Sequence, residues 1–151
     1  MRAQIFSLSA VLGLVFWSAS AFSTDFPVQL PSREDYKPIL RREAFNQTLK
    51  MAQIHKEAWT RHPFLIALRF VGEIPEAPQR SVEYFSMPEK PALVRVVITD
   101  QGFLDDSIQS SRYRIYLEYM SPGFWYVTRA EEAWRCQPNR GHQNYSTQAC
   151  H

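Results

Sequence analysis

The spacing of apolar side chains predicts a helix in the first half of the chain. Between Ile39 and Thr60 there is no glycine or proline, and apolar residues recur at the three- and four-residue intervals of one helical face. The apolar stripe consists of Phe45, Leu49, Ala52 and Trp59, with Met51, Ile54 and Ala58 beside it. We expect this stripe to pack against a core and the opposite, charged side to face water.

A second, shorter apolar stretch runs from Phe64 to Val71. Pro63 stands just before it and Gly72 just after it, which is typical of a helix start and a helix end. The prediction is a short second helix. A buried strand remains the alternative, because a run of this length fits both structures.

The C-terminal half shows the two-residue alternation of β-strands. Leu93 to Thr99 is apolar and β-branched, Arg112 to Tyr119 alternates cleanly, and Phe124 to Trp134 follows a Ser-Pro-Gly turn. The proline-rich stretch from Glu73 to Pro91 predicts mostly loop. A short edge strand is expected within it at Val82 to Phe85, because proline cannot donate to a sheet ladder.

The last two strands predict a hairpin closed by a four-residue loop, Met120 to Gly123. The register that follows pairs these residues: Tyr119 with Phe124, Leu117 with Tyr126, Ile115 with Thr128, and Arg114 with Arg129. The pairing of two arginines is unfavourable, and a slip of two residues would place Arg114 beside Glu131 instead. An even slip leaves the faces unchanged, so the faces are the safer prediction.

This register leaves an aromatic and basic patch on the outer sheet face. The patch consists of Tyr116, Trp125 and Val127 beside Arg114 and Arg129. Aromatic side chains with arginine mark interfaces, so Trp125, Tyr116 and Arg114 are candidate binding residues. The alternative is that the N-terminal lead-in or the proline-rich loop covers this face.

Helices followed by an antiparallel sheet predict an α+β fold. We expect an N-terminal helix, plus the short second helix, packed on a curved antiparallel sheet of three to four strands with a C-terminal disulfide loop. The expected domains are a signal peptide at 1–21, an extended lead-in at 22–38 and a single α+β domain at 39–151.

The signal peptide is predicted from the first residues. Met1-Arg2 precedes an apolar run from Ile5 to Trp17 and the small residues Ala19-Ser20-Ala21, the pattern of a secretory signal cut after Ala21. The run is too short to favour a transmembrane helix. We therefore expect a secreted or periplasmic protein that is not stably inserted in a membrane after cleavage.

The charge of the chain narrows the class of partner. Its formal net charge is +2 at pH 7, which offers no electrostatic case for nucleic acid or an anionic membrane. Another secreted or envelope protein is the expected partner, no cofactor is expected, and the oligomeric state stays open.

The two cysteines, Cys136 and Cys150, are expected to pair in an oxidising compartment. The loop they close is worth about 3 kcal/mol in the chain-entropy description. A metal or redox pair is the alternative, although the spacing is not that of Cys-x-x-Cys. Asn46 and Asn144 each begin a glycosylation sequon, which matters only in a eukaryotic secretory pathway.

The disulfide loop is the first candidate site. It is polar, Gly141 permits close backbone approach, and Arg140, His142 and Tyr145 offer donors, an imidazole and an aromatic anchor. The alternative is a structural clip that ties the C-terminal tail to the sheet.

Other groups carry weaker signals. Asp105-Asp106-Ser107 reads as a solvated bend, and His55 and His62 lack a carboxylate at metal-ligand spacing. No metal site is expected from them. The chain holds neither Gly-x-Ser-x-Gly nor a glycine-rich phosphate loop, so no catalytic residue is assigned.

The chain resembles small secreted bacterial proteins of unknown function. The residues that carry this resemblance are Trp59-Thr60-Arg61-His62-Pro63, Ala67-Leu68, Asp105-Asp106-Ser107, Arg112-Tyr113-Arg114, the run Trp134 to Gln143, and Cys150. The resemblance implies export and fold, and no chemistry. The order of elements also resembles cystatin-like and NTF2-like architectures. The segment Val94 to Ile98 lacks the Gln-x-Val-x-Gly hairpin of cystatin inhibitors, so cysteine-protease inhibition is not supported.

The leading hypothesis is a non-enzymatic binding or structural module of the cell envelope, acting through the disulfide loop or the outer sheet face. The second hypothesis is an envelope enzyme or small-ligand carrier with a pocket between helix and sheet. A pocket lined by titratable groups would favour it, and an interior filled by Trp59, Phe64 and Phe70 would exclude it. The third is a structural protein without a ligand.

Overall fold

The computed structural model describes residues 34–73, 77 and 79–151. The predicted signal peptide and residues 22–33 of the lead-in lie outside the described residues. None of the described helices is long and apolar enough to cross a bilayer.

The fold is α+β, as predicted, with five described strands in place of the three or four expected. The elements in chain order are β1 (Lys37–Pro38), α1 (Arg42–Ile54), the 3₁₀ helix η1 (Ala58–Arg61), α2 (Pro63–Val71), β2 (Gln79–Met87), β3 (Lys90–Gln101), β4 (Ile108–Met120) and β5 (Phe124–Cys136). All pairings are antiparallel, and the strand order is β1-β5-β4-β3-β2.

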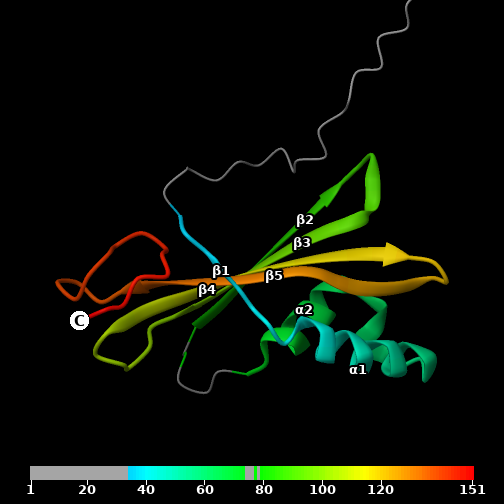
Figure 1. The fold of residues 1–151 in the computed structure, drawn as a ribbon, viewed down its shortest axis with the longest axis horizontal. Helices are drawn as coiled ribbons and strands as arrows, with labels where there is room; N and C mark the ends of the chain where they lie inside the picture. The colour runs from blue at the N-terminus through cyan, green and yellow to red at the C-terminus, as the bar shows by residue number, and fades with distance from the viewer. Residues whose placement is uncertain (1–33, 74–76, 78) are drawn as a thin grey trace, which may run out of the picture.

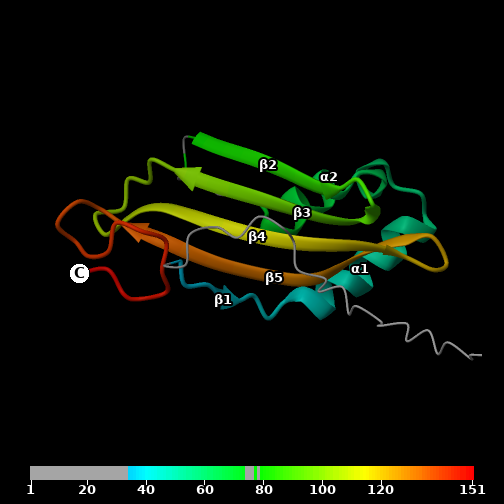
Figure 2. The ribbon, with the colours of Figure 1, turned by 90° about the horizontal axis from the view of Figure 1, so that it is seen from above.

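The described helices cover one face of the sheet, and the core lies between the two layers (Figure 1). Leu49, Ile66 and Phe70 from the helices meet apolar residues of β3, β4 and β5. The other buried members of this cluster, among the described residues, are Ala67, Val71, Val94, Val96, Ile98, Ile115, Leu117, Val127 and Ala130. The disulfide loop lies at one end of the sheet and the β4–β5 hairpin at the other (Figure 2).

The single long helix expected over 39–60 is wrong in length. α1 ends at Ile54, and Lys56 takes a left-handed conformation with φ of 57°. That turn ends the helix and redirects the chain into η1. The second helix is confirmed as α2, and Gly72 ends it at φ of 86° with its N–H donated to the Leu68 carbonyl.

A polar stripe on α1 pairs with the backbone of β5. Asn46 exchanges two hydrogen bonds of 2.9 Å with the backbone of Val127, and Gln53 does the same with Trp125 at 2.7 and 3.0 Å. Amide side chains therefore satisfy the edge of β5 where β1 does not reach it, which keeps that edge from pairing with another chain. The side-chain amide of Asn46, the first residue of a glycosylation sequon, is therefore already hydrogen-bonded within the fold.

The proline-rich stretch is less of a loop than expected, because β2 spans nine residues. It is an edge strand, as predicted, and Pro78 and Pro88 stand just outside it. An ion pair fixes its start: Arg80 binds both carboxylate oxygens of the fully buried Asp100 at 2.6 and 2.8 Å. The nearby Asp100 raises the pKa of Arg80, chiefly through these hydrogen bonds.

The expected hairpin register is wrong by one residue at the turn. Met120, rather than Tyr119, lies opposite Phe124, so the first half of β5 presents the opposite faces from those expected. A bulge at Thr128 then restores the faces. Beyond the bulge, Arg114 lies opposite Glu131, which is the two-residue slip that relieves the arginine pair.

Candidate functional site

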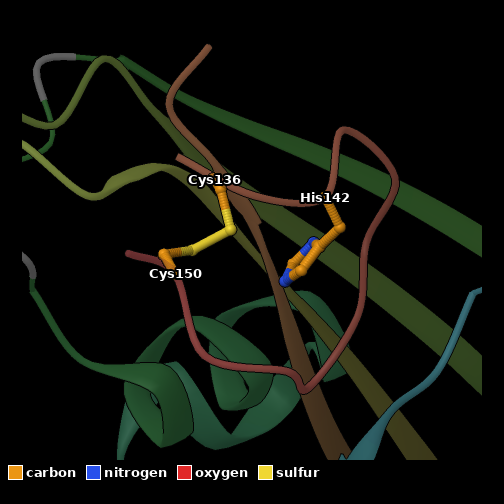
Figure 3. Close-up of side chains that lie close together, drawn as sticks. All are labelled: Cys136, His142 and Cys150. Atoms are coloured by element: carbon orange, nitrogen blue, oxygen red, sulfur yellow. A yellow bond between two sulfur atoms is a disulfide. The ribbon is translucent and has the colours of Figure 1, made fainter. Parts of the chain in front are cut away.

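The disulfide loop is tied to itself and to the sheet. Cys136 and Cys150 are bonded, as predicted. Figure 3 shows His142 beside this bond, and its ring nitrogens lie 2.8 Å from the Asn144 carbonyl oxygen and 3.0 Å from that of Gln148. The polar atoms of the loop are thus largely used within it.

Tyr145 is buried and is not an exposed anchor. Its side chain is 7% exposed, its hydroxyl lies 3.0 Å from the Ser110 hydroxyl, and the Arg112 guanidinium stacks 3.7 Å from its ring centroid. Trp134 and Ser146 also exchange backbone hydrogen bonds. These contacts fit a clip that ties the tail to the sheet.

Gly141 brings the backbone close to Cys136 instead of to a ligand. A Cβ at this position would lie 2.8 Å from the Cys136 sulfur, and φ is +141°. Arg140 keeps about half of its side chain exposed, and its guanidinium lies 3.6 Å from the Asp106 carboxylate. Of the three loop candidates, Arg140 is the most accessible.

The lead-in covers part of the outer sheet face. Glu34 binds Arg112 at 3.0 Å and also binds Arg114, and the Tyr36 ring stacks 3.7 Å from the Arg114 guanidinium carbon. Burial raises the pKa of the Tyr36 hydroxyl above its ordinary value of 10.0. The alternative in which the N-terminal lead-in covers the outer face is therefore seen at Arg112 and Arg114. The Arg114 side chain is only 13% exposed.

Of the other two outer-face candidates, one lies on the expected face and one does not. Tyr116 is on the outer face, where the Arg129 guanidinium lies 5.1 Å from its ring and Arg129 binds Glu131. Trp125 is on the helix-covered face and packs against the core, because of the register shift at the turn. The structure therefore does not bring the six candidate residues together.

Trp125 instead lines a hollow at the hairpin end of the molecule. The hollow has a volume of about 340 Å³ and opens between the end of α1, η1 and the β4–β5 hairpin. Its lining consists of Gln53, Lys56, Thr60, Arg61, Tyr119, Gly123, Phe124 and Trp125. We call this the hairpin hollow.

Local contacts fix the walls of the hairpin hollow. The Gln53 amide holds the Trp125 backbone, and the Thr60 hydroxyl donates to the Glu57 carbonyl at 2.7 Å, which anchors η1. The Tyr119 and Trp125 ring centroids are 5.2 Å apart. The aromatic wall is therefore held by both layers of the fold.

Two cations at the hollow have no carboxylate partner within the described part of the chain. Lys56 and Arg61 are exposed, and among the described residues neither takes part in an ion pair or a side-chain hydrogen bond. Elsewhere arginines are matched with carboxylates, as at Arg80, Arg112 and Arg129. Cations that line the same hollow as aromatic side chains suit an anionic group that carries an apolar or aromatic substituent.

The interior between the helices and the sheet is filled by side chains. Leu49 and Ile66 are completely buried there, and Phe70 packs edge-on against Phe45 at 5.0 Å. Trp59 packs at the margin of this core, whereas Phe64 is 40% exposed. Among the described residues, the hollow lined by Gln53 of α1 and Trp125 of β5 lies at the hairpin end of this interface.

The remaining sequence candidates behave as local structure. The Asp105 carboxylate accepts hydrogen bonds from the backbone and hydroxyl of Ser107 and the backbone of Ile108, and these lower its pKa. This is the predicted bend. His55 ends α1, and His62 precedes α2.

Sequence reasoning missed Lys56, Arg61 and Tyr119. The helix predicted over 39–60 includes Lys56 and ends one residue before Arg61, so it does not contain the turn that the structure shows at Lys56. Pro63 was the available signal that the chain turns before α2.

The chain matches no protein-family model, and neither a curated protein nor a solved structure shows significant similarity to it. The functional argument therefore rests on the residues themselves.

Proposed function

We propose that this protein is an exported, non-enzymatic binding module that receives the C-terminal carboxylate of another protein in the hairpin hollow. The supporting observation is that Lys56 and Arg61, which have no carboxylate partner among the described residues, line the same hollow as Tyr119 and Trp125. A terminal carboxylate would lie between the cations, and the last side chain of the partner would pack against the rings.

The size and chemistry of the hollow support this ligand class. A volume of about 340 Å³ is at the small end of ligand sites, which suits one or two terminal residues rather than a cofactor. Its lining has no histidine, cysteine or carboxylate, and the Thr60 hydroxyl is already donated to a carbonyl. No acid–base pair stands in the hollow, so binding is a better fit than catalysis.

The test uses acetyl-Gly-Gly-Phe with a free C-terminal carboxylate as the probe and the same peptide as its C-terminal amide. We expect the free acid to shift the NMR signals of the Trp125 indole and the Gly123 amide, with a dissociation constant on the order of 10⁻³ M or tighter. The amide should bind at least about tenfold more weakly. Added salt should lower the affinity of the protein for the free-acid peptide, because it screens the attraction between opposite charges. Equal binding of acid and amide contradicts the proposal.

Two double variants with the same change in net charge test whether peptide binding depends on the cations of the hollow or only on the overall charge of the protein. Lys56→Ala with Arg61→Ala should abolish the response, because both cations of the hollow are removed. Lys50→Ala with Lys90→Ala removes the same charge from other exposed positions and should leave binding unchanged. If both double variants bind alike, the hollow is not the site.

A small carboxylic acid tests whether the protein is instead a carrier of small ligands. N-benzoylglycine has a carboxylate and a ring but no peptide chain beyond them. If it binds as tightly as the peptide acid, the protein is a small-ligand carrier, and the proposal of a protein partner fails.

Export is part of the proposal and has its own test. The disulfide is consistent with an oxidising compartment, and cleavage after Ala21 would leave residues 22–151. An intact mass from the native host that matches this range less two hydrogens supports export. A mass that retains residues 1–21 contradicts the cleavage.

A further inference from the structure

Three potential metal ligands meet in the disulfide loop. The sulfurs of Cys136 and Cys150 and a ring nitrogen of His142 all lie within 4.8 Å of one another, and Figure 3 shows the imidazole beside the sulfur pair. In a tetrahedral zinc site, such atoms are roughly 3.5 to 3.8 Å apart. Opening the sulfur–sulfur bond is therefore the main change that a metal would require.

The surroundings of His142 are compatible with a ligand role. The two ring nitrogens lie 2.8 Å from the Asn144 carbonyl oxygen and 3.0 Å from the Gln148 carbonyl oxygen. A metal would take the lone pair of one ring nitrogen in place of that nitrogen's contact with a carbonyl oxygen. The other contact has the form usual for metal-bound histidine, whose second nitrogen donates to a carbonyl.

The loop has enough other contacts to stay in place when the disulfide is open. The Cys136 N–H donates to the His142 carbonyl at 3.1 Å, and the His151 N–H donates to the Arg140 carbonyl at 2.7 Å, next to Cys150. The Trp134 indole donates to the Gln148 carbonyl at 2.8 Å. These bonds hold both cysteines near His142 without the covalent link.

We propose that the dithiol form of this protein binds one Zn²⁺ through Cys136, Cys150 and His142, and that disulfide formation expels it. The dithiol form arises in each newly made chain, or when a dithiol reductant transfers two electrons and two protons to the disulfide and becomes a disulfide itself. Zinc then replaces the two thiol protons, which pass to water, and a water molecule completes the coordination. Sulfur and imidazole ligands are those that zinc prefers.

The experiment compares reduced and oxidised protein without oxygen. Zn²⁺ is titrated against a chromogenic chelator, and Co²⁺ serves as a second probe because thiolate ligands give it an intense near-ultraviolet charge-transfer band. We expect one metal per reduced chain, the thiolate band with Co²⁺, and neither signal from oxidised protein. Far-ultraviolet circular dichroism of the reduced protein checks that the fold persists before metal is added.

Histidine variants test the third ligand, and far-ultraviolet circular dichroism of each oxidised variant checks that it keeps the fold. His142→Ala should weaken zinc binding by at least about tenfold to a hundredfold, the range seen when even an indirect ligand contact is lost. His55→Ala, at an exposed position at the end of α1, should leave zinc binding unchanged. Zinc should also protect the thiols of the parent protein, but not those of His142→Ala, from maleimide.

Three results would overturn the proposal. They are equal zinc binding by oxidised and reduced protein, unchanged affinity in His142→Ala, or a stoichiometry of one zinc for two chains. If the reduced chain proves unfolded, recovery of the far-ultraviolet spectrum on zinc addition supports the site, and failure to recover counts against it.

Discussion

The two ends of the sheet use their polar side chains in opposite ways. At the disulfide end, Tyr145, His142 and Glu34 are engaged with other parts of the same chain. At the hairpin end, Lys56 and Arg61 have no partner among the described residues. The first end closes the fold on itself, and the second leaves charge available to a ligand.

This difference separates stability from recognition. A buried polar group that loses its partner costs about 1–3 kcal/mol, whereas an exposed charge without one costs little. Substitutions at the disulfide end should therefore act on unfolding, and substitutions at the two cations should act on binding. The predictions below test this division, beginning with the largest expected effect.

The largest contrast is expected between two tyrosines. Tyr145→Ala should lower the free energy of unfolding by about 3–5 kcal/mol, because a buried ring is lost from beneath Arg112. Tyr119→Ala, in the hairpin hollow and 48% exposed, should cost less than about 1 kcal/mol. Urea unfolding followed by circular dichroism measures both, and similar costs would remove the distinction between the two ends.

The disulfide should account for the next effect. Replacing Cys136 and Cys150 by serine should lower the free energy of unfolding by about 3 kcal/mol, because the open chain regains the entropy of a loop with a sequence separation of 14. Binding of the peptide acid at the hairpin hollow should stay the same. A loss of peptide binding in the folded variant would show that the two ends are coupled.

Gln53 lines the hairpin hollow and also hydrogen-bonds the Trp125 backbone, so a substitution there tests whether the hairpin end also contains a residue that stabilises the fold. Gln53→Ala should cost about 1–3 kcal/mol, because two backbone groups of Trp125 lose their partner. Gln47→Ala, exposed on the same helix, should change stability by less than about 0.5 kcal/mol. Thermal unfolding of both variants checks this. Equal melting temperatures would mean that the hydrogen bonds between Gln53 and the Trp125 backbone contribute nothing to stability.

The smallest effect is a dependence on alkaline pH at the covered sheet face. Burial raises the pKa of Tyr36, so the folded state favours the protonated phenol. Its contribution to stability is complete below the unfolded value of 10.0 and is lost as pH rises toward the folded value. Tyr36→Phe should therefore lose less stability than the parent protein when the pH is raised from neutral to values above 10.0. The midpoints of urea unfolding measure this loss. Equal pH dependence of the midpoint in both proteins would contradict the prediction.

Much of the fold follows from local patterns. Two-residue alternation identified β4, and the Pro63 and Gly72 boundaries identified α2. The pairing of the two cysteines was expected for an oxidising compartment, and the structure confirms it. Each of these inferences depends on residues close together in the sequence or on the only available partner.

The hairpin faces and the candidate site did not follow in this way. One residue fewer in the β4–β5 turn reversed the first half of β5 and moved Trp125 to the helix-covered face. The left-handed Lys56 broke the helix and brought Lys56 and Arg61 to the hollow. Turn length and a single backbone conformation carry little signal in hydropathy, so local patterns could not reveal them.

The sequence by itself determined that α1 and α2 precede the strands β2 to β5, and it determined the apolar layer and the disulfide, because periodicity and cysteine count record them directly. Only the tertiary structure decided which polar groups are satisfied. Glu34 reaches Arg112 and Tyr145 reaches Ser110 across long stretches of chain, whereas Lys56 and Arg61 find no described carboxylate. Charge pairing depends on distances in space, and residues far apart in sequence meet only once the sheet and helices have packed.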